Sequence, residues 1–242
     1  MEHKAVQQTS GPWDRRETSA KRMDAFTDSA FAFAITLVVF DTGGIPNSVT
    51  ELQNALLQLP ASLASLAFLM GFWLEHRRFG SLVTVRDRLV DAISLGIVIA
   101  VLVFVLPLAL LSDSIAHWIS DASLPGHGLR QHELRHLYAA YGAGFGVLSA
   151  TFLILYRYAS ARPVALAIAP HIAPRLRRRA MFWAMAGATG ALSAILAMHV
   201  APAILPWAPG AIYLSLIPAY LTVATIEKRI RRSEARAMDD TI

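Results

Sequence analysis

Long apolar blocks dominate this sequence, and they restrict the chain to folds that a lipid bilayer can accommodate. A helix needs roughly 20 apolar residues to cross the bilayer core. Six blocks approach or meet that length, the first being the shortest: residues 26–40, 52–74, 89–111, 137–156, 180–200 and 204–226. Because unpaired backbone groups are costly in lipid, we expect each block to be an α-helix. The sequence therefore predicts an all-α, polytopic membrane protein with six transmembrane helices.

The composition supports this class and excludes others. Of the 242 residues, 55% are hydrophobic and only 16% are charged, whereas about a quarter of the residues in a soluble domain are charged. The chain has no cysteine, which excludes a disulfide framework and a thiolate zinc site. The net charge of +5 is better explained by basic loops that fix membrane topology than by a nucleic-acid partner. The polar residues 1–22 lack the apolar core of a signal peptide.

The distribution of basic residues predicts the orientation of the spans. Of the 22 Lys and Arg residues, 20 lie in the N-terminal segment, in the loops after the second and fourth spans, and in the C-terminal tail. With six spans all these segments lie on one side, which leaves Arg130 and Arg135 opposite. Because cytoplasmic loops are enriched in Lys and Arg, we expect a cell-membrane protein with both termini in the cytoplasm. We interpret the run RLRRR at 175–179 as a topology anchor that also contacts anionic lipid headgroups.

This topology predicts three parts of the chain: a cytoplasmic N-terminal segment at 1–20, a transmembrane domain at 21–227 and a cytoplasmic tail at 228–242. We interpret Glu227 and the charged tail that follows it as the end of a helix with charge pairs four residues apart.

The first span carries a stripe of residues at helical spacing. The stripe consists of Phe26, Ser29, Phe33, Thr36, Leu37 and Phe40. Such a stripe is also typical of ordinary packing against lipid or a neighbouring helix. Asp28 lies about 140° around the helix from Phe33 at 100° per residue, so the carboxylate points elsewhere. An ionisable group at the edge of a span normally has a partner, and the candidates are Arg22, Trp73 and His76.

The same segment resembles a known family. Residues 22–41, RMDAFTDSAFAFAITLVVFD, are similar to the first helix of the bacterial relatives of transmembrane protein 175, a lysosomal potassium channel. Arg22, Phe26, Thr27 and Asp28 occupy the positions of the family's Arg-x-x-x-Phe-Ser-Asp signature, with threonine in place of serine. AFAIT at 32–36 and the closing Asp41 also match.

Weaker similarities follow in the next two spans. FLMGFWLEHRRF at 68–79 looks like the end of the family's second helix, where a tryptophan precedes histidine; here these are Trp73 and His76. VFVLPLALL at 103–111 looks like its third helix. The resemblance implies that Arg22, Phe26, Thr27, Asp28, Trp73 and His76 form the supporting network of the first helix.

The resemblance implies a function as well. Members of the family are homotetrameric, passive potassium-selective channels whose first helices line the pore. By position, the apolar rings of the constriction would be Phe33, Leu37 and Phe40, with Thr36 as a layer of hydroxyls. The family usually has an aliphatic residue where this chain has Phe33. The implied protein is no enzyme; its partners are its own copies and membrane lipids. It needs no cofactor, metal site or small-molecule substrate, because potassium is only the permeant ion.

A second motif points to a different class. HELRH at 132–136 fits H-E-x-x-H, in which two histidines one helical turn apart bind zinc and Glu133 acts as general base. A third ligand is needed, and His171 and His199 are poor candidates. We expect these residues to lie in a polar external loop that leads into the fourth span. A membrane-embedded zinc metalloprotease remains an alternative, as does a secondary transporter, although the broken helices typical of transporters are not evident.

Overall fold

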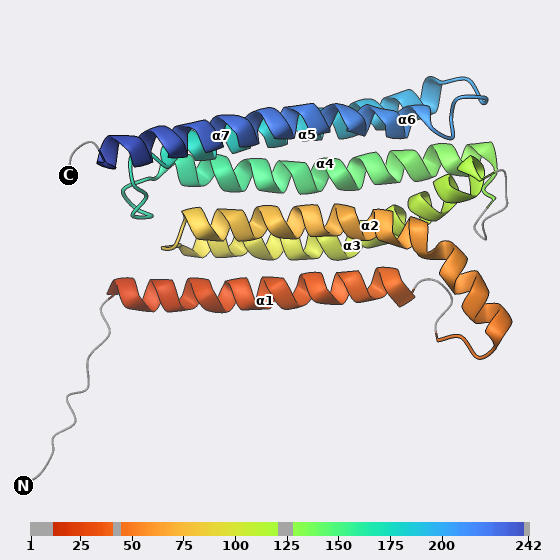
Figure 1. Cartoon of the computed structure of the whole chain (residues 1–242), viewed down its shortest axis with the longest axis horizontal. Coiled ribbons are helices and arrows are strands. Elements are labelled where there is room, and N and C mark those ends of the chain that lie inside the picture. Colours follow the sequence, from red (N-terminus) through yellow and green to blue (C-terminus); the bar gives the residue numbers. More distant parts are fainter. Residues whose placement is uncertain (1–11, 41–44, 121–127, 240–242) are drawn as a thin grey trace, which may run out of the picture.

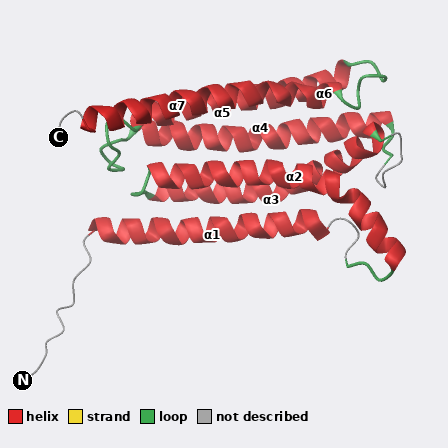
Figure 2. Ribbon diagram, in the orientation of Figure 1, coloured by secondary structure: helices red, strands yellow, loops and turns green. Residues whose placement is uncertain are grey.

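The computed structural model describes residues 12–40, 45–120 and 128–239. This part of the chain is helical and contains no strand (Figure 2), so the predicted all-α class is confirmed there. The elements are α1 (Pro12–Phe40), α2 (Val49–Leu82), α3 (Arg88–Ile119), α4 (Gln131–Ala161), α5 (Ala173–His199), α6 (Ala208–Ala211), the 3₁₀ helix η1 (Ile212–Ser215) and α7 (Leu216–Asp239). Three parts of the predictions lie outside the described residues: positions 1–11 of the N-terminal segment, the motif residue Asp41, and residues 240–242 of the tail.

Local polar residues set several helix ends. The Ser48 hydroxyl accepts a hydrogen bond from the Glu51 amide at 3.1 Å, and Oδ1 of Asp87 accepts one from the Val90 amide at 3.0 Å. Such caps satisfy amides that have no partner inside the helix. At the far end of α5, the Arg135 guanidinium of α4 donates to the carbonyl of Val200 at 2.7 Å, which satisfies a carbonyl left without an intrahelical partner.

The long helices lie side by side in layers (Figure 1). α1 forms one edge and packs against α3 and α2; α4 packs against α3 and α5, and α7 packs on α5. Successive long helices alternate in direction, so the start of α1 and the end of α7 lie at the same end of the bundle. The short loops at 83–87 and 162–172 are at that end too. The described parts of the basic segments named above therefore gather at one end of the bundle.

Aromatic rings fill the centre between α2, α3, α4 and α5. The Phe72 ring lies 5.9 Å from that of Phe104 and 5.8 Å from that of Trp183, and Phe152 stacks on Trp183 at 4.4 Å. Close to this cluster α4 and α5 touch through backbone, because a Cβ at Gly142 would lie only 2.6 Å from the carbonyl oxygen of Gly190. Small residues permit such close approach of membrane helices.

Most helices extend beyond the predicted spans. α2 reaches Leu82, eight residues past its predicted end, and α3 runs to Ile119 rather than to residue 111. The apolar blocks mark only the part of a helix that suits hydrocarbon, whereas polar residues continue the helix on either side. The expectation of a polar loop around HELRH is wrong for the same reason, since α4 begins at Gln131.

Within the described residues, five helical segments are long and apolar enough to cross a membrane: α2, α3, α4, α5 and Ala208–Ile230. The chain is thus helical with several candidate spans, as the apolar blocks predict. α1 is not among these five. Pro202 and Pro206 lie between α5 and the last span, where proline lacks the amide that would continue a helix, and Pro209 lies in the first turn of α6.

Candidate functional site

α1 has one face turned into the bundle. Thr27, Phe31, Ala34 and Val38 are buried on this face, at spacings of four, three and four residues that keep them in line along a helix. Phe31, Ala34 and Val38 join the central apolar core. This face holds α1 against α2 and α3.

The opposite face of α1 is uncovered in the single chain and carries the predicted stripe. Phe26, Phe33 and Leu37 are 52%, 57% and 38% exposed. Thr36 is exposed as well, and its hydroxyl donates to the Ala32 carbonyl at 2.9 Å. Phe40 ends the helix, and its side chain lies outside the described part of the chain. Phe33, Thr36 and Leu37 thus share one accessible surface.

Asp28 is held by a residue of α2. Nε1 of Trp73 donates to Oδ1 of Asp28 at 2.8 Å, and the guanidinium of Arg77 lies 4.8 Å from the centre of the Trp73 ring. The carboxylate is half-buried. The bond joins α1 to α2, away from the stripe.

The other members of the predicted network are not joined by such bonds. Arg22 is exposed, and no ion pair joins it to Asp28 in the part of the chain that the structure describes. Thr27 and His76 are buried, and neither Oγ1 of Thr27 nor Nε2 of His76 has a hydrogen-bond partner among residues 12–40, 45–120 and 128–239. Within the described part of the predicted network, the hydrogen bond from Trp73 to Asp28 is the contact that joins α1 to α2.

A second link from α1 was not anticipated from the sequence. Nη1 and Nη2 of Arg86 lie 2.8 Å and 3.1 Å from the two carboxylate oxygens of Asp24. The Arg86 side chain is only 1% exposed, and that of Asp24 is 36% exposed. Nη2 donates a hydrogen bond to Oδ2, and the Nη1–Oδ1 contact is an ion pair, so the guanidinium faces the carboxylate with two of its nitrogens. In the sequence, Arg86 is an arginine in a loop of only five residues, and it belongs to the basic residues from which the orientation of the spans is predicted.

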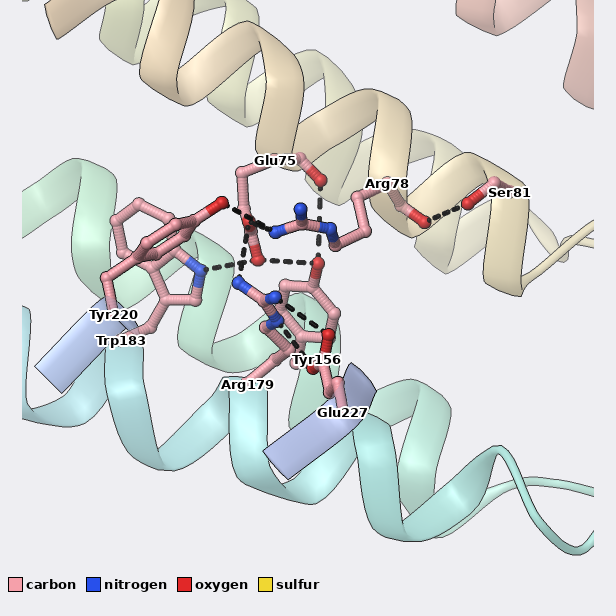
Figure 3. A network of polar contacts seen from close by, with 8 residues as sticks. All are labelled: Glu75, Arg78, Ser81, Tyr156, Arg179, Trp183, Tyr220 and Glu227. Atoms are coloured by element: carbon pink, nitrogen blue, oxygen red, sulfur yellow. Dashed lines mark hydrogen bonds and ion pairs between the residues drawn. The ribbon is translucent and has the colours of Figure 1, made fainter. Parts of the chain in front are cut away.

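A buried ionic cluster joins α2, α4, α5 and α7 (Figure 3). It consists of Glu75, Arg78, Tyr156, Arg179, Trp183, Tyr220 and Glu227. Nε and Nη2 of Arg179 each donate to Glu227 at 2.9 Å, and Nη1 of Arg179 donates to Glu75 at 3.2 Å. Tyr156 donates to Glu75 at 2.8 Å. Arg78, whose side chain is 32% exposed, lies 3.1 Å from Glu75, so two arginines balance the two buried carboxylates.

This cluster corrects one interpretation of the sequence. Arg179, the last residue of RLRRR, is fully buried rather than a headgroup-facing anchor. Glu227 pairs with Arg179 across helices, and the side chain of Arg231, four residues further on, lies outside the described part of the chain. The signal that could have found the cluster was Glu75, an acidic residue directly after the apolar block of the second span.

The HELRH residues have structural roles. Oε2 of Glu133 accepts a hydrogen bond from the Arg130 amide at 2.8 Å and caps α4. Nδ1 of His136 lies 2.7 Å from the carbonyl oxygen of His132. In the described ranges no group of three His, Asp or Glu side chains is arranged to hold a metal ion. Glu133 is therefore engaged in a helix cap.

Comparison with known proteins supplies an independent view of the chain. A family model described as the endosomal/lysosomal potassium channel TMEM175 matches residues 22–107. These residues run from the first arginine of the motif to Pro107 and include α2. No curated protein matches the sequence.

Solved structures share the fold. A variant of the potassium channel MtTMEM175, crystallised with a nanobody–MBP fusion protein, superposes with a TM-score of 0.69 at 20% identity, over 86% of this chain and 93% of that one. A lysosomal potassium-selective channel TMEM175 homologue from Chamaesiphon Minutus gives a TM-score of 0.52 at 23% identity, over 85% of this chain and 98% of that one. At these identities the structures establish a common fold.

The family match and the shared fold agree with the motif of the first helix. The family is one of ion channels rather than of peptidases. The resemblance seen in the sequence is confirmed: the TMEM175 potassium channel family model matches residues 22–107, and the chain shares the fold of the solved TMEM175 channels.

Proposed function

We propose that this protein is a passive potassium-selective channel, formed by a homotetramer whose four α1 helices surround the pore. The observation that carries the proposal is the accessible apolar face of α1, with Phe33, Thr36 and Leu37 in line, in a segment that matches a potassium channel family. One helix cannot enclose a pore, so several copies are required, and closed rotational symmetry supplies them.

α1 would be the sixth membrane helix in this assembly. It has 29 residues, which correspond to about 44 Å of helix and exceed the roughly 30 Å of a bilayer core. It lies alongside α2 and α3 (Figure 1), two of the candidate spans. With six spans, the basic end of the bundle faces the cytoplasm of a cell membrane, both termini are cytoplasmic, and residues 21–227 form the channel domain.

The residues of the stripe suit two tasks in a pore. Four copies each of Phe33, Leu37 and Phe40 would form apolar collars, and a narrow apolar collar expels water and so blocks ions until it widens. Because the Thr36 hydroxyl already donates to Ala32, its oxygen keeps lone pairs that can face a cation. Neutral oxygens of this kind suit the weakly hydrated potassium ion.

The partners follow from the same arrangement. The chain binds copies of itself, and lipid surrounds the outer helices. Potassium is the permeant ion, and no step needs a cofactor or an organic substrate. Asp28 and Trp73, with Arg22, Phe26, Thr27 and His76 around them, would position α1 rather than meet the ion.

A flux assay tests the proposal. The purified oligomer is placed in liposomes with an outward potassium gradient, and ion flux is followed with a potassium ionophore as the reference for full release. We expect flux down the gradient, slower when sodium replaces potassium, and none in protein-free liposomes. A well-folded oligomer that passes no potassium would contradict the channel function.

A further inference from the structure

Polar side chains tie the middle of α1 to the rest of the bundle. Asp24 pairs with Arg86, and one turn later Asp28 accepts from Trp73. Beyond Asp28, the described hydroxyls of α1 bond within their own helix, as Thr36 does with Ala32. The inner face there is apolar. Thus the described polar links to other helices hold α1 near its middle, whereas Ala34 and Val38 of its constriction half pack into the apolar core.

Arg86 is a fixed partner rather than a flexible surface arginine. Its side chain is buried, its Nε donates to the carbonyl of Val83 at 3.3 Å, and its guanidinium lies 5.6 Å from the centre of the Phe79 ring. These contacts come from the end of α2 and the loop after it. They hold the guanidinium in the position where Asp24 meets it.

We infer that Arg86, acting through Asp24, sets the tilt of α1 and thereby the width of the constriction at Phe33 and Leu37. The inference rests on the proposed function, in which α1 lines the pore. Arg86 is a positioning residue here, since it lies on the inner side of α1 and does not meet the ion.

The geometry of a helix gives this anchor leverage. Thirteen residues separate Asp24 from Leu37, which is about 20 Å along the axis. A change in tilt of about 5° at the anchor would therefore shift Leu37 by about 2 Å. Four such shifts act together on an apolar collar, where small changes in width decide whether water and ions enter.

Gly80 provides a way to disturb the pair without removing a charge. A Cβ at Gly80 would lie 2.8 Å from Nη2 of Arg86 and 3.2 Å from Oδ2 of Asp24, so alanine must displace the pair. Gly71 lies on the same helix, and a Cβ there would meet nothing within 4 Å. Gly80→Ala and Gly71→Ala are thus a matched test and control.

The experiment records single channels of the full-length oligomer in planar bilayers with potassium on both sides. Five proteins are compared: wild type, Asp24→Asn, Gly80→Ala, Gly71→Ala, and the charge exchange Asp24→Arg with Arg86→Asp. Each must elute as the wild-type oligomer. Gly80→Ala keeps both charges, so the test does not depend on a variant that leaves Arg86 without its carboxylate.

We expect a loosened anchor to let α1 lean away from the axis. The open probability should rise about fivefold or more, the lower range of typical coupling energies, in Asp24→Asn and Gly80→Ala but not in Gly71→Ala. The potassium-to-sodium permeability ratio should stay unchanged, and the charge exchange should return the open probability toward wild type. An unchanged or lower open probability in Gly80→Ala would overturn the inference, as would an equal rise in Gly71→Ala.

The outcome is separable from that of the proposed function. A wild-type oligomer that does not conduct contradicts the channel itself. If the wild type conducts but its open probability does not change in Asp24→Asn and Gly80→Ala, the channel function stands and only the role proposed for Arg86 is wrong.

Discussion

Phe33 stands where the family that the first helix resembles usually has an aliphatic residue, and substituting it tests the stripe directly. Its ring is more than half exposed on the accessible face of α1. If four such rings close the pore, Phe33→Ala removes most of one collar, and the leak of potassium should rise several-fold. Leu37→Ala should act in the same direction. Single-channel or liposome flux measurements check both.

A control comes from another exposed apolar residue. Leu192 of α5 is exposed in the single chain as well, but it belongs to a helix at the other side of the bundle (Figure 1). Leu192→Ala should leave the leak unchanged. If Phe33→Ala, Leu37→Ala and Phe40→Ala all conduct as wild type does, the pore face has been misassigned.

Asp28 should matter for assembly rather than for selectivity. Asp28→Ala removes the acceptor of the Trp73 bond, and hydrogen bonds to charged groups contribute about 1.5–3 kcal/mol. We expect a lower thermal stability in detergent and less oligomer. Trp73→Phe, which removes only the donor, should have the same effect. Normal assembly with altered ion selectivity in Asp28→Ala would instead place the carboxylate on the ion path.

At the scale of helices, the buried ionic cluster joins the two halves of the chain. Glu227→Gln would leave Arg179 buried with only part of its counter-charge, and breaking a buried pair in this way costs about 3–5 kcal/mol. The midpoint temperature of thermal unfolding of the Glu227→Gln oligomer should be markedly lower than that of the wild type. The exposed pair of Lys21 and Glu17, 2.9 Å apart, is the control, since surface pairs contribute at most about 1 kcal/mol. Equal effects of Glu17→Gln and Glu227→Gln would refute this role.

The helices were predictable from the sequence where hydropathy alone decides them. The apolar blocks located the long helices, because an apolar run of that length has few other stable conformations. The ends were not predictable to the same degree: α2 continues to Leu82 through HRRF, residues that hydropathy assigns to a loop. The helix continues there because Glu75, His76 and Phe79 are buried against neighbouring helices, and contacts between distant segments are not visible in a local pattern.

The candidate site divides in the same way. The stripe of α1 follows from helical spacing, and spacing correctly separated it from Asp28. Trp73 could be named as a candidate partner of Asp28 because an ionisable group at the edge of a span needs a partner and Trp73 lies at the cytoplasmic end of the second span. Arg86 and Arg179 were both read as topology signals, since a basic residue near a span is usually solvated. Only the three-dimensional arrangement distinguishes a buried arginine from a solvated one.

At the scale of the whole molecule, the bundle leaves α1 at its edge with an apolar face uncovered (Figure 1). In the proposed tetramer that face meets three copies of itself around the axis. The purified protein should therefore have four times the chain mass of 26.4 kDa after correction for detergent, as measured by light scattering. A stable, conducting monomer would exclude a pore built from several first helices.

The cysteine-free sequence allows one measurement that tests the position of α1 directly. In Leu37→Cys the introduced thiol is the only one in each chain. If α1 lines the pore, four thiols gather around the axis, and a thiol-reactive reagent or Cd²⁺ should block potassium flux through Leu37→Cys oligomers while leaving Leu192→Cys oligomers open. Flux through Leu37→Cys that is insensitive to these reagents, with labelling of the thiol verified, would contradict a pore lined by the first helix.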